Sequence, residues 1–243
     1  MKKVFRFGLI SIIVLTVCTC LGFFIWSQQT YEPTEELYTL VDKNEIKQDE
    51  FGVIFKPKGN KDVGIILYPG AKVEPEAYSY IGQQLADQGY LVVIPRVLFN
   101  FSLFDINITQ EIVNEFESVR EWYVGGHSLG GVSAATYAYE HPNKVDGLIL
   151  LASYPSNNND FSNMDLPMLS IYAENDGLST IEKINETKHL LSKRLMIYEI
   201  KGGNHAQFGI YGPQKGDNKA TISIKEQQKT IVNVMSKWLS TFH

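Results

Sequence analysis

The stretch Gly126-His127-Ser128-Leu129-Gly130 decides the fold that we expect for this chain. It fits the pattern Gly-x-Ser-x-Gly, preceded by an apolar β-like segment (121–125) and followed by a small-residue segment typical of a helix (131–138). A serine on a sharp turn from strand to helix is exposed at the top of an α/β sheet, where its hydroxyl can act as a nucleophile. The pattern can also arise by chance in a chain with 19 glycines, and its strand–turn–helix setting is what argues against chance.

Apolar runs and helical patterns alternate along the rest of the chain. Strands are expected at 51–55, 63–68, 90–94, 122–125, 145–151, 167–172 and 195–200, and helices at 34–42, 74–88, 108–119, 129–140, 180–192 and 224–239. Strict alternation predicts an α/β fold with a mostly parallel sheet and helices on both faces. Ligands of such sheets bind at the carboxyl ends of the strands, where Ser128 lies.

Two connections bear on access to that edge of the sheet. The connection 152–166 is short and rich in asparagine, so no large cap is expected over the site. The segment 96–105 holds five large apolar side chains, Leu98, Phe99, Phe101, Leu103 and Phe104. They could overhang the site as an acyl-binding wall, or they could be ordinary core packing.

The N-terminal region is apolar and carries its charge at the front. Three basic residues, Lys2, Lys3 and Arg6, precede an uncharged stretch (7–26), about the 20 residues needed to cross a bilayer. A cleaved signal peptide and a lipoprotein signal at Cys18 or Cys20 are the alternatives. We expect an uncleaved transmembrane helix with the domain outside the cytoplasm, because basic flanks stay inside. The predicted organisation is an anchor or signal sequence (1–27), a stalk (28–45) and one catalytic domain (46–243).

Cysteine content and charge exclude other chemistries. Both cysteines lie in the apolar N-terminal stretch, so the domain has neither a thiol nucleophile nor a disulfide. That stretch and its flank also hold three of the 22 basic residues and none of the 27 acidic ones, which leaves an acidic domain. Nucleic acid is therefore not an expected partner.

A serine nucleophile needs a base, and the base needs an orienting acid. Of the five histidines, His127 should point away from the serine, His141 ends the predicted helix 129–140, His189 lies inside a predicted helix, and His243 is the last residue given. His205 remains, in a loop directly after the last predicted strand, although a solvated loop histidine is the alternative there.

Asp176 is the candidate acid, just past the strand 167–172, with Glu174 as the second candidate. An aspartate near a helix start is usually a cap. Here the segment from Ser179 to Glu182 is expected to supply a capping box of its own, which leaves Asp176 free for catalysis.

An oxyanion hole needs two backbone N–H groups. The residue after the nucleophile, Leu129, should supply one. Ala71, in the turn after the buried strand 63–68, should supply the other, unless this is a plain Pro-Gly turn.

Together these segments resemble the α/β-hydrolase superfamily, and more narrowly its small, lidless, dienelactone-hydrolase-like members. The similar segments are 67–71, 90–96, 125–131, 174–178 and 202–209. The segment 211–217 also resembles this subgroup, but its residue types do not indicate a function. The resemblance implies the α/β-hydrolase fold and a Ser-Asp-His triad. Dienelactone hydrolases use a cysteine where this chain has Ser128, so the resemblance does not carry over their substrate, and dehalogenase-like relatives use aspartate.

The sequence thus predicts a membrane-anchored serine hydrolase that cleaves a carboxylic ester, or a related acyl bond, of a small-molecule substrate through Ser128, His205 and Asp176. Neither a metal nor a cofactor is expected, because no metal-ligand or phosphate-loop motif is present. A peptidase, thioesterase or lipase with the same triad, a non-catalytic surface binding protein on this fold, and a secreted form after signal cleavage are the alternatives.

Overall fold

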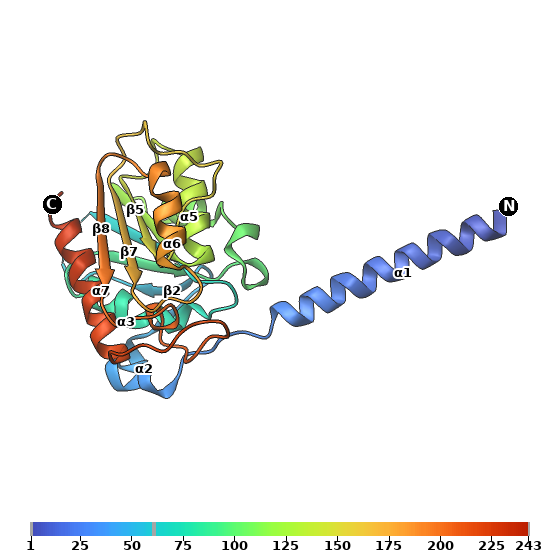
Figure 1. The fold of residues 1–243 in the computed structure, drawn as a ribbon, viewed down its shortest axis with the longest axis horizontal. Helices are drawn as coiled ribbons and strands as arrows, with labels where there is room; N and C mark the ends of the chain where they lie inside the picture. The colour runs from blue at the N-terminus through green and yellow to red at the C-terminus, as the bar shows by residue number, and fades with distance from the viewer. Residues whose placement is uncertain (1, 60–61, 243) are drawn as a thin grey trace.

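A twisted sheet forms the centre of the molecule (Figure 1). The computed structural model describes residues 2–59 and 62–242. The sheet order is β1-β2-β4-β3-β5-β6-β7-β8. The strands are β1 Lys47–Gln48, β2 Gly52–Phe55, β3 Val63–Tyr68, β4 Leu91–Pro95, β5 Glu121–His127, β6 Gly147–Leu151, β7 Met168–Ala173 and β8 Leu195–Ile200.

From β4 to β8 every pairing is parallel, whereas β1 and β2 add an antiparallel edge. The central strands β3, β4 and β6 are buried along their whole length, as expected for strands covered on both faces. The predicted parallel sheet is therefore correct. The two-residue strand β1 was not predicted, because a strand that short has no periodicity to detect.

The helices lie on both faces of the sheet. They are α2 Glu35–Leu40, α3 Ser79–Ala86, α4 Ile108–Glu115, α5 Leu129–Glu140, α6 Ile181–Thr187 and α7 Ile224–Leu239. Two buried cores follow from the period-two alternation of strand side chains. Ile65 of β3 packs in the core that includes residues of α2, α3 and α7, while the next residue, Ile66, packs in the core that includes residues of α4 and α5. Figure 1 shows α7 and α5 on opposite sides of the sheet.

The N-terminal helix α1, Lys2–Ser27, projects away from the domain as a single long helix (Figure 1). Residues Phe5–Ser27 are long and apolar enough to cross a membrane. The segment expected as a stalk lies against the domain. Tyr31 exchanges backbone hydrogen bonds with Lys72 and Glu74, and the side chain of Leu37 is fully buried in the main core.

Several helix ends differ from the expected ones. The predicted helix 74–88 begins as a 3₁₀ turn and becomes α-helical only at Ser79, and the helix 180–192 ends in a 3₁₀ turn after Thr187. The connection 152–166 holds neither helix nor strand, so no large cap covers the sheet edge. The segment 96–105 forms two short 3₁₀ turns, Leu98–Asn100 and Ser102–Phe104.

Candidate active site

Ser128 occupies the sharp turn between β5 and α5. Its backbone has φ 53° and ψ −120°, a region that costs a non-glycine residue on the order of 1–3 kcal/mol. A Cβ on Gly126 would lie 2.3 Å from the backbone of Gly130, and one on Gly130 would lie 2.3 Å from the carbonyl oxygen of Tyr68. Glycine is thus required on both sides of the serine, as the sequence pattern predicts.

Several hydrogen bonds hold this strained turn. The Ser128 N–H donates to the carbonyl of Leu151 at the end of β6, and the Ser153 hydroxyl donates to the Ser128 carbonyl over 2.6 Å. Ser128 as a whole is partly exposed, whereas His127 before it is buried. Ser153 is a supporting residue that sequence reasoning missed, because no local motif marks it.

His205 and Asp176 lie in the loops that follow the carboxyl ends of β8 and β7, and their side chains are in contact. Nδ1 of His205 lies 2.8 Å from Oδ2 of Asp176, and neither side chain is exposed. A carboxylate can only accept here, so Nδ1 donates to it, and in a neutral ring Nε2 then carries the lone pair. Nε2 is buried and has no hydrogen-bond partner among the described residues. It is therefore available to accept a proton.

The other oxygen of Asp176 caps a turn. Oδ1 accepts from the backbone N–H of Leu178 over 2.8 Å and of Ser179 over 2.6 Å. Helix α6 begins after Thr180, whose side chain makes no capping bond to the backbone. The expected capping box is thus wrong: Oδ1 of Asp176 caps the turn before α6, while its Oδ2 contacts His205.

Glu174, the second candidate acid, is directed elsewhere. Its Oε2 accepts from the Gly202 N–H over 2.8 Å, and its Oε1 lies 3.7 Å from Nζ of Lys201. Its side chain is 45% exposed, so it stays in contact with water. Of the two acids, only Asp176 contacts the ring of His205.

The structure does not show the hydrogen bond between Ser128 and His205 that a complete triad has. Among the described residues, no hydrogen bond joins Oγ of Ser128 to Nε2 of His205. Such bonds are often long in a site without substrate and tighten when substrate binds. The remaining histidines lie apart from the serine or are bound otherwise: His141 ends α5, and Nδ1 of His189 bonds to the Glu186 carbonyl. His243 lies outside the described residues.

Two backbone donors are unoccupied near Ser128. The N–H groups of Ala71 and Leu129 find no acceptor among the described residues, whereas the neighbouring Gly70 and Lys72 N–H groups are both bonded. Free donors on the turn after β3 and at the first residue of α5 are what an oxyanion hole requires.

His127 and Tyr78 support the turn that holds Ala71. The Gly70 N–H donates to the Tyr78 hydroxyl, which lies 2.9 Å from Nδ1 of His127. Burial, and then the nearby His205, lower the pKa of His127 well below its usual range. The hydrogen bond between the Tyr78 hydroxyl and a neutral His127 therefore links the residue before the nucleophile to the turn that carries the predicted donor. The ring centroids of His127 and His205 lie 4.5 Å apart.

Asp217 joins the two loops that carry His205 and Asp176. Its Oδ1 accepts from the N–H groups of Gly177 and His205, and its Oδ2 accepts from Ala206 over 2.8 Å. This aspartate lies in the segment 211–217, to which the sequence alone assigned no role. Its side chain joins the loop that carries Asp176 to the loop that carries His205.

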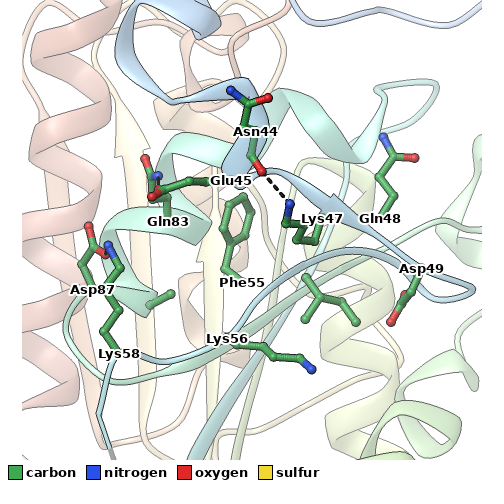
Figure 2. A pocket seen from close by; sticks show the side chains of 12 residues that line it. Asn44, Glu45, Lys47, Gln48, Asp49, Phe55, Lys56, Lys58, Gln83 and Asp87 are labelled. Carbon is green, nitrogen blue, oxygen red and sulfur yellow. Dashed lines mark hydrogen bonds and ion pairs between the residues drawn. The ribbon is translucent and has the colours of Figure 1, made fainter.

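A separate cavity of about 630 Å³ lies at the antiparallel edge, next to β1 and α3 (Figure 2). Charged residues surround it, including the Lys58–Asp87 ion pair, and Phe55 lies between them. None of the predicted site residues lines this cavity. It therefore belongs to another part of the molecule.

The comparisons with known proteins agree with the observed fold. Residues 64–229 match the sequence model described as "Alpha/beta hydrolase family". No curated protein sequence matches the chain significantly. The fold is similar to MGS-MChE2, an alpha/beta hydrolase enzyme from a metagenome of lagoon sediments at Mar Chica, Morocco, with TM-score 0.60 and 17% identity over 81% of this chain and 98% of that one.

Two further solved structures share the fold. Est1E from Butyrivibrio proteoclasticus has TM-score 0.58 and 14% identity, covering 80% of this chain and 98% of its own. A predicted CIB-like hydrolase from Thermoplasma acidophilum has TM-score 0.54 and 16% identity, covering 78% and 95%. At these identities the likeness establishes the fold alone.

Proposed function

The chain belongs to the alpha/beta hydrolase family, and we propose that it is a serine hydrolase that cleaves carboxylic esters through Ser128, His205 and Asp176. One observation carries the proposal: the buried Asp176–His205 pair leaves the other ring nitrogen of His205 unpaired. A histidine held in this tautomer is the base that a serine hydroxyl needs. If the Asp176–His205 pair had only a structural role, Nε2 of His205 would not need to stay without a partner.

In the first half of the reaction the enzyme is acylated. Oγ of Ser128 attacks the ester carbonyl carbon while Nε2 of His205 takes the hydroxyl proton. The carbonyl oxygen becomes an oxyanion, and the N–H groups of Ala71 and Leu129 donate to it. The tetrahedral intermediate then collapses: the bond to the alcohol oxygen breaks, and the alcohol leaves with the proton from His205.

In the second half water releases the acid. His205 takes a proton from water, whose oxygen attacks the acyl carbon of the Ser128 ester. The intermediate uses the same two backbone donors, the bond to Oγ breaks, and Ser128 recovers its proton. Asp176 stays ionised throughout and stabilises the imidazolium that forms twice per cycle. Ester and water become acid and alcohol, with no other reactant.

We further propose that α1 anchors the enzyme in a membrane with the catalytic domain outside the cytoplasm. The length and apolar character of Phe5–Ser27 support the span. The basic residues before it support the orientation, because such residues remain on the cytoplasmic side.

The bond specificity is tested on matched substrates. The full-length protein in detergent is assayed on an ester, a thioester and an anilide with the same acetyl group, beside Ser128→Ala. We expect ester turnover that exceeds amide turnover and is lost in the variant. Equal ester turnover by both proteins would contradict the proposal, and a preference for the anilide would make the enzyme an amidase.

A further inference from the structure

The loop 97–105, here called the aromatic loop, exposes apolar side chains to an unusual degree. Outside α1, seven large apolar side chains are exposed among the described residues. Four of them belong to this loop: Leu98, Phe99, Leu103 and Phe104. Single exposed apolar residues are normal on a protein surface, whereas a cluster marks a contact with another apolar body. The loop is therefore not the core packing that its sequence also allowed.

The aromatic loop contacts the end of α1 that is nearest the domain. The ring of Phe23 lies 5.8 Å from that of Phe99 and 5.9 Å from that of Phe104. Trp26 stacks on Phe101 at 5.5 Å, and Nδ2 of Asn100 donates to the Ser27 carbonyl. Helix and loop thus form one continuous apolar surface.

The depth of these contacts follows from helix geometry. Phe23 precedes the end of the apolar span at Ser27 by four residues, which is about 6 Å along the helix. Rings that touch Phe23 lie at the same level as the last turn of the span. If α1 crosses a bilayer, Phe99 and Phe104 must enter its interface beside Trp26, where aromatic side chains are favoured.

The aromatic loop also forms hydrogen bonds with the two segments that carry the predicted oxyanion donors, Ala71 and Leu129. The Lys72 N–H, next to Ala71, donates to the Asn100 carbonyl over 2.8 Å. The Ser102 hydroxyl, which accepts from Ser133, reaches the Leu129 carbonyl at 3.4 Å. A loop seated in the bilayer would therefore hold Ser128 and the two predicted donors close to the membrane surface.

From these contacts we infer that the aromatic loop docks into the membrane that holds α1, and that Ser128 takes long-chain acyl esters from that bilayer. The substrate assignment rests on the proposed hydrolase function, whereas the docking does not. Electrostatic attraction is not the driving force, because the chain is acidic, with net charge −5 at pH 7 even with its basic N-terminal flank. Docking therefore works on zwitterionic lipid.

The docking is tested by a fluorescent reporter that needs no activity. Both cysteines of the chain lie in α1, so Cys18→Ser with Cys20→Ser frees the domain for labelling. Phe104→Cys carries an NBD group, and Tyr198→Cys, an exposed aromatic position on β8, is the matched control. In phosphatidylcholine vesicles we expect a blue-shifted emission at position 104 that doxyl-lipid quenches, and aqueous emission at 198. Equal quenching of both positions by iodide in the water would overturn the docking.

The substrate assignment is tested with Leu103→Ser plus Phe104→Ser in the full-length protein in the same vesicles. We expect hydrolysis of p-nitrophenyl dodecanoate, dissolved in the bilayer, to fall roughly tenfold. Hydrolysis of p-nitrophenyl acetate, dissolved in water, should stay within about twofold, and Tyr198→Ser should change neither rate. A dodecanoate rate that is unchanged, or that falls together with the acetate rate, would overturn the assignment.

The two failures are distinguishable. If the parent hydrolyses acetate and the loop variant leaves the dodecanoate rate unchanged, the inference fails while the proposed function stands. If the parent hydrolyses neither ester although the reporter at position 104 lies in lipid, the proposed function fails, the substrate assignment fails with it, and the docking stands.

Discussion

Asp176 divides its two carboxylate oxygens between His205 and the backbone. Oδ2 lies 2.8 Å from Nδ1 of His205, while Oδ1 accepts two N–H groups of the following turn. The cap fixes the carboxylate, and the carboxylate fixes the imidazole. Ring orientation at the candidate site therefore depends on a local turn as well as on the sheet.

Asp176→Asn should lower kcat for p-nitrophenyl acetate by roughly three to four orders of magnitude, because an amide can hold the histidine in the wrong tautomer and cannot stabilise its cation. Glu174→Gln should change kcat by less than about threefold, because Glu174 bonds to Gly202 and not to the ring of His205. Steady-state kinetics of both variants decide which acid serves His205. The opposite ranking would assign the role to Glu174.

Tyr78→Phe should lower kcat by roughly tenfold with little change in KM, because it removes the acceptor that holds the Gly70 N–H next to the predicted donor Ala71. The fold should persist, since the ring remains to fill its buried site. Tyr80→Phe is the control, because the Tyr80 hydroxyl makes no hydrogen bond among the described residues. Equal kcat and KM for the two variants would show that Tyr78 does not contribute to catalysis.

Asp217→Asn should lower kcat by roughly tenfold and change KM less. The amide NH₂ that replaces one carboxylate oxygen cannot accept a hydrogen bond from a backbone N–H. Asp160→Asn is the matched control, since Asp160 accepts from the backbone only in its own exposed turn. If the two substitutions have equal effects on kcat, Asp217 does not position the acid and base loops.

Buried His127 predicts how stability depends on pH. The folded-state pKa of His127 is depressed, so below about pH 6.5 the unfolded chain binds a proton that the native site does not. This group therefore destabilises the native state as pH falls, by at most about 2 kcal/mol at pH 5. Urea unfolding of the parent and His127→Gln, followed by tryptophan fluorescence, should show a smaller loss of stability between pH 7 and pH 5 in the variant. An identical loss in both proteins would contradict a depressed pKa.

Local sequence determines most of the fold and the position of Ser128. The glycines around Ser128 allow close backbone contacts, and those contacts are set by the turn itself, so a pattern of five residues was enough. The sequence also predicts the parallel strands, because strands buried on both faces are continuously apolar, as Val63–Tyr68 is. The place of His205 after the last strand predicts it as the base, and its ring lies against Asp176 in the structure.

Long-range contacts explain what the sequence did not reveal. Asp217 acts on Gly177, which is 40 residues away, and no periodicity connects them. The sequence does not predict that Asp176 both caps a turn and contacts His205, because the two contacts use different oxygens of one carboxylate. Leu37 lies in the expected stalk but packs in the core, because a helix of six residues carries too little pattern to indicate that it docks.

The central claim is that Ser128 is an activated nucleophile, and one labelling measurement tests it most directly. The full-length protein in detergent and its Ser128→Ala variant are treated with a fluorophosphonate, and the modified peptide is identified by mass spectrometry. We predict one covalent adduct, on Ser128 in the parent and absent from the folded variant. A folded parent that remains unlabelled, or a variant labelled to the same extent, would contradict the account.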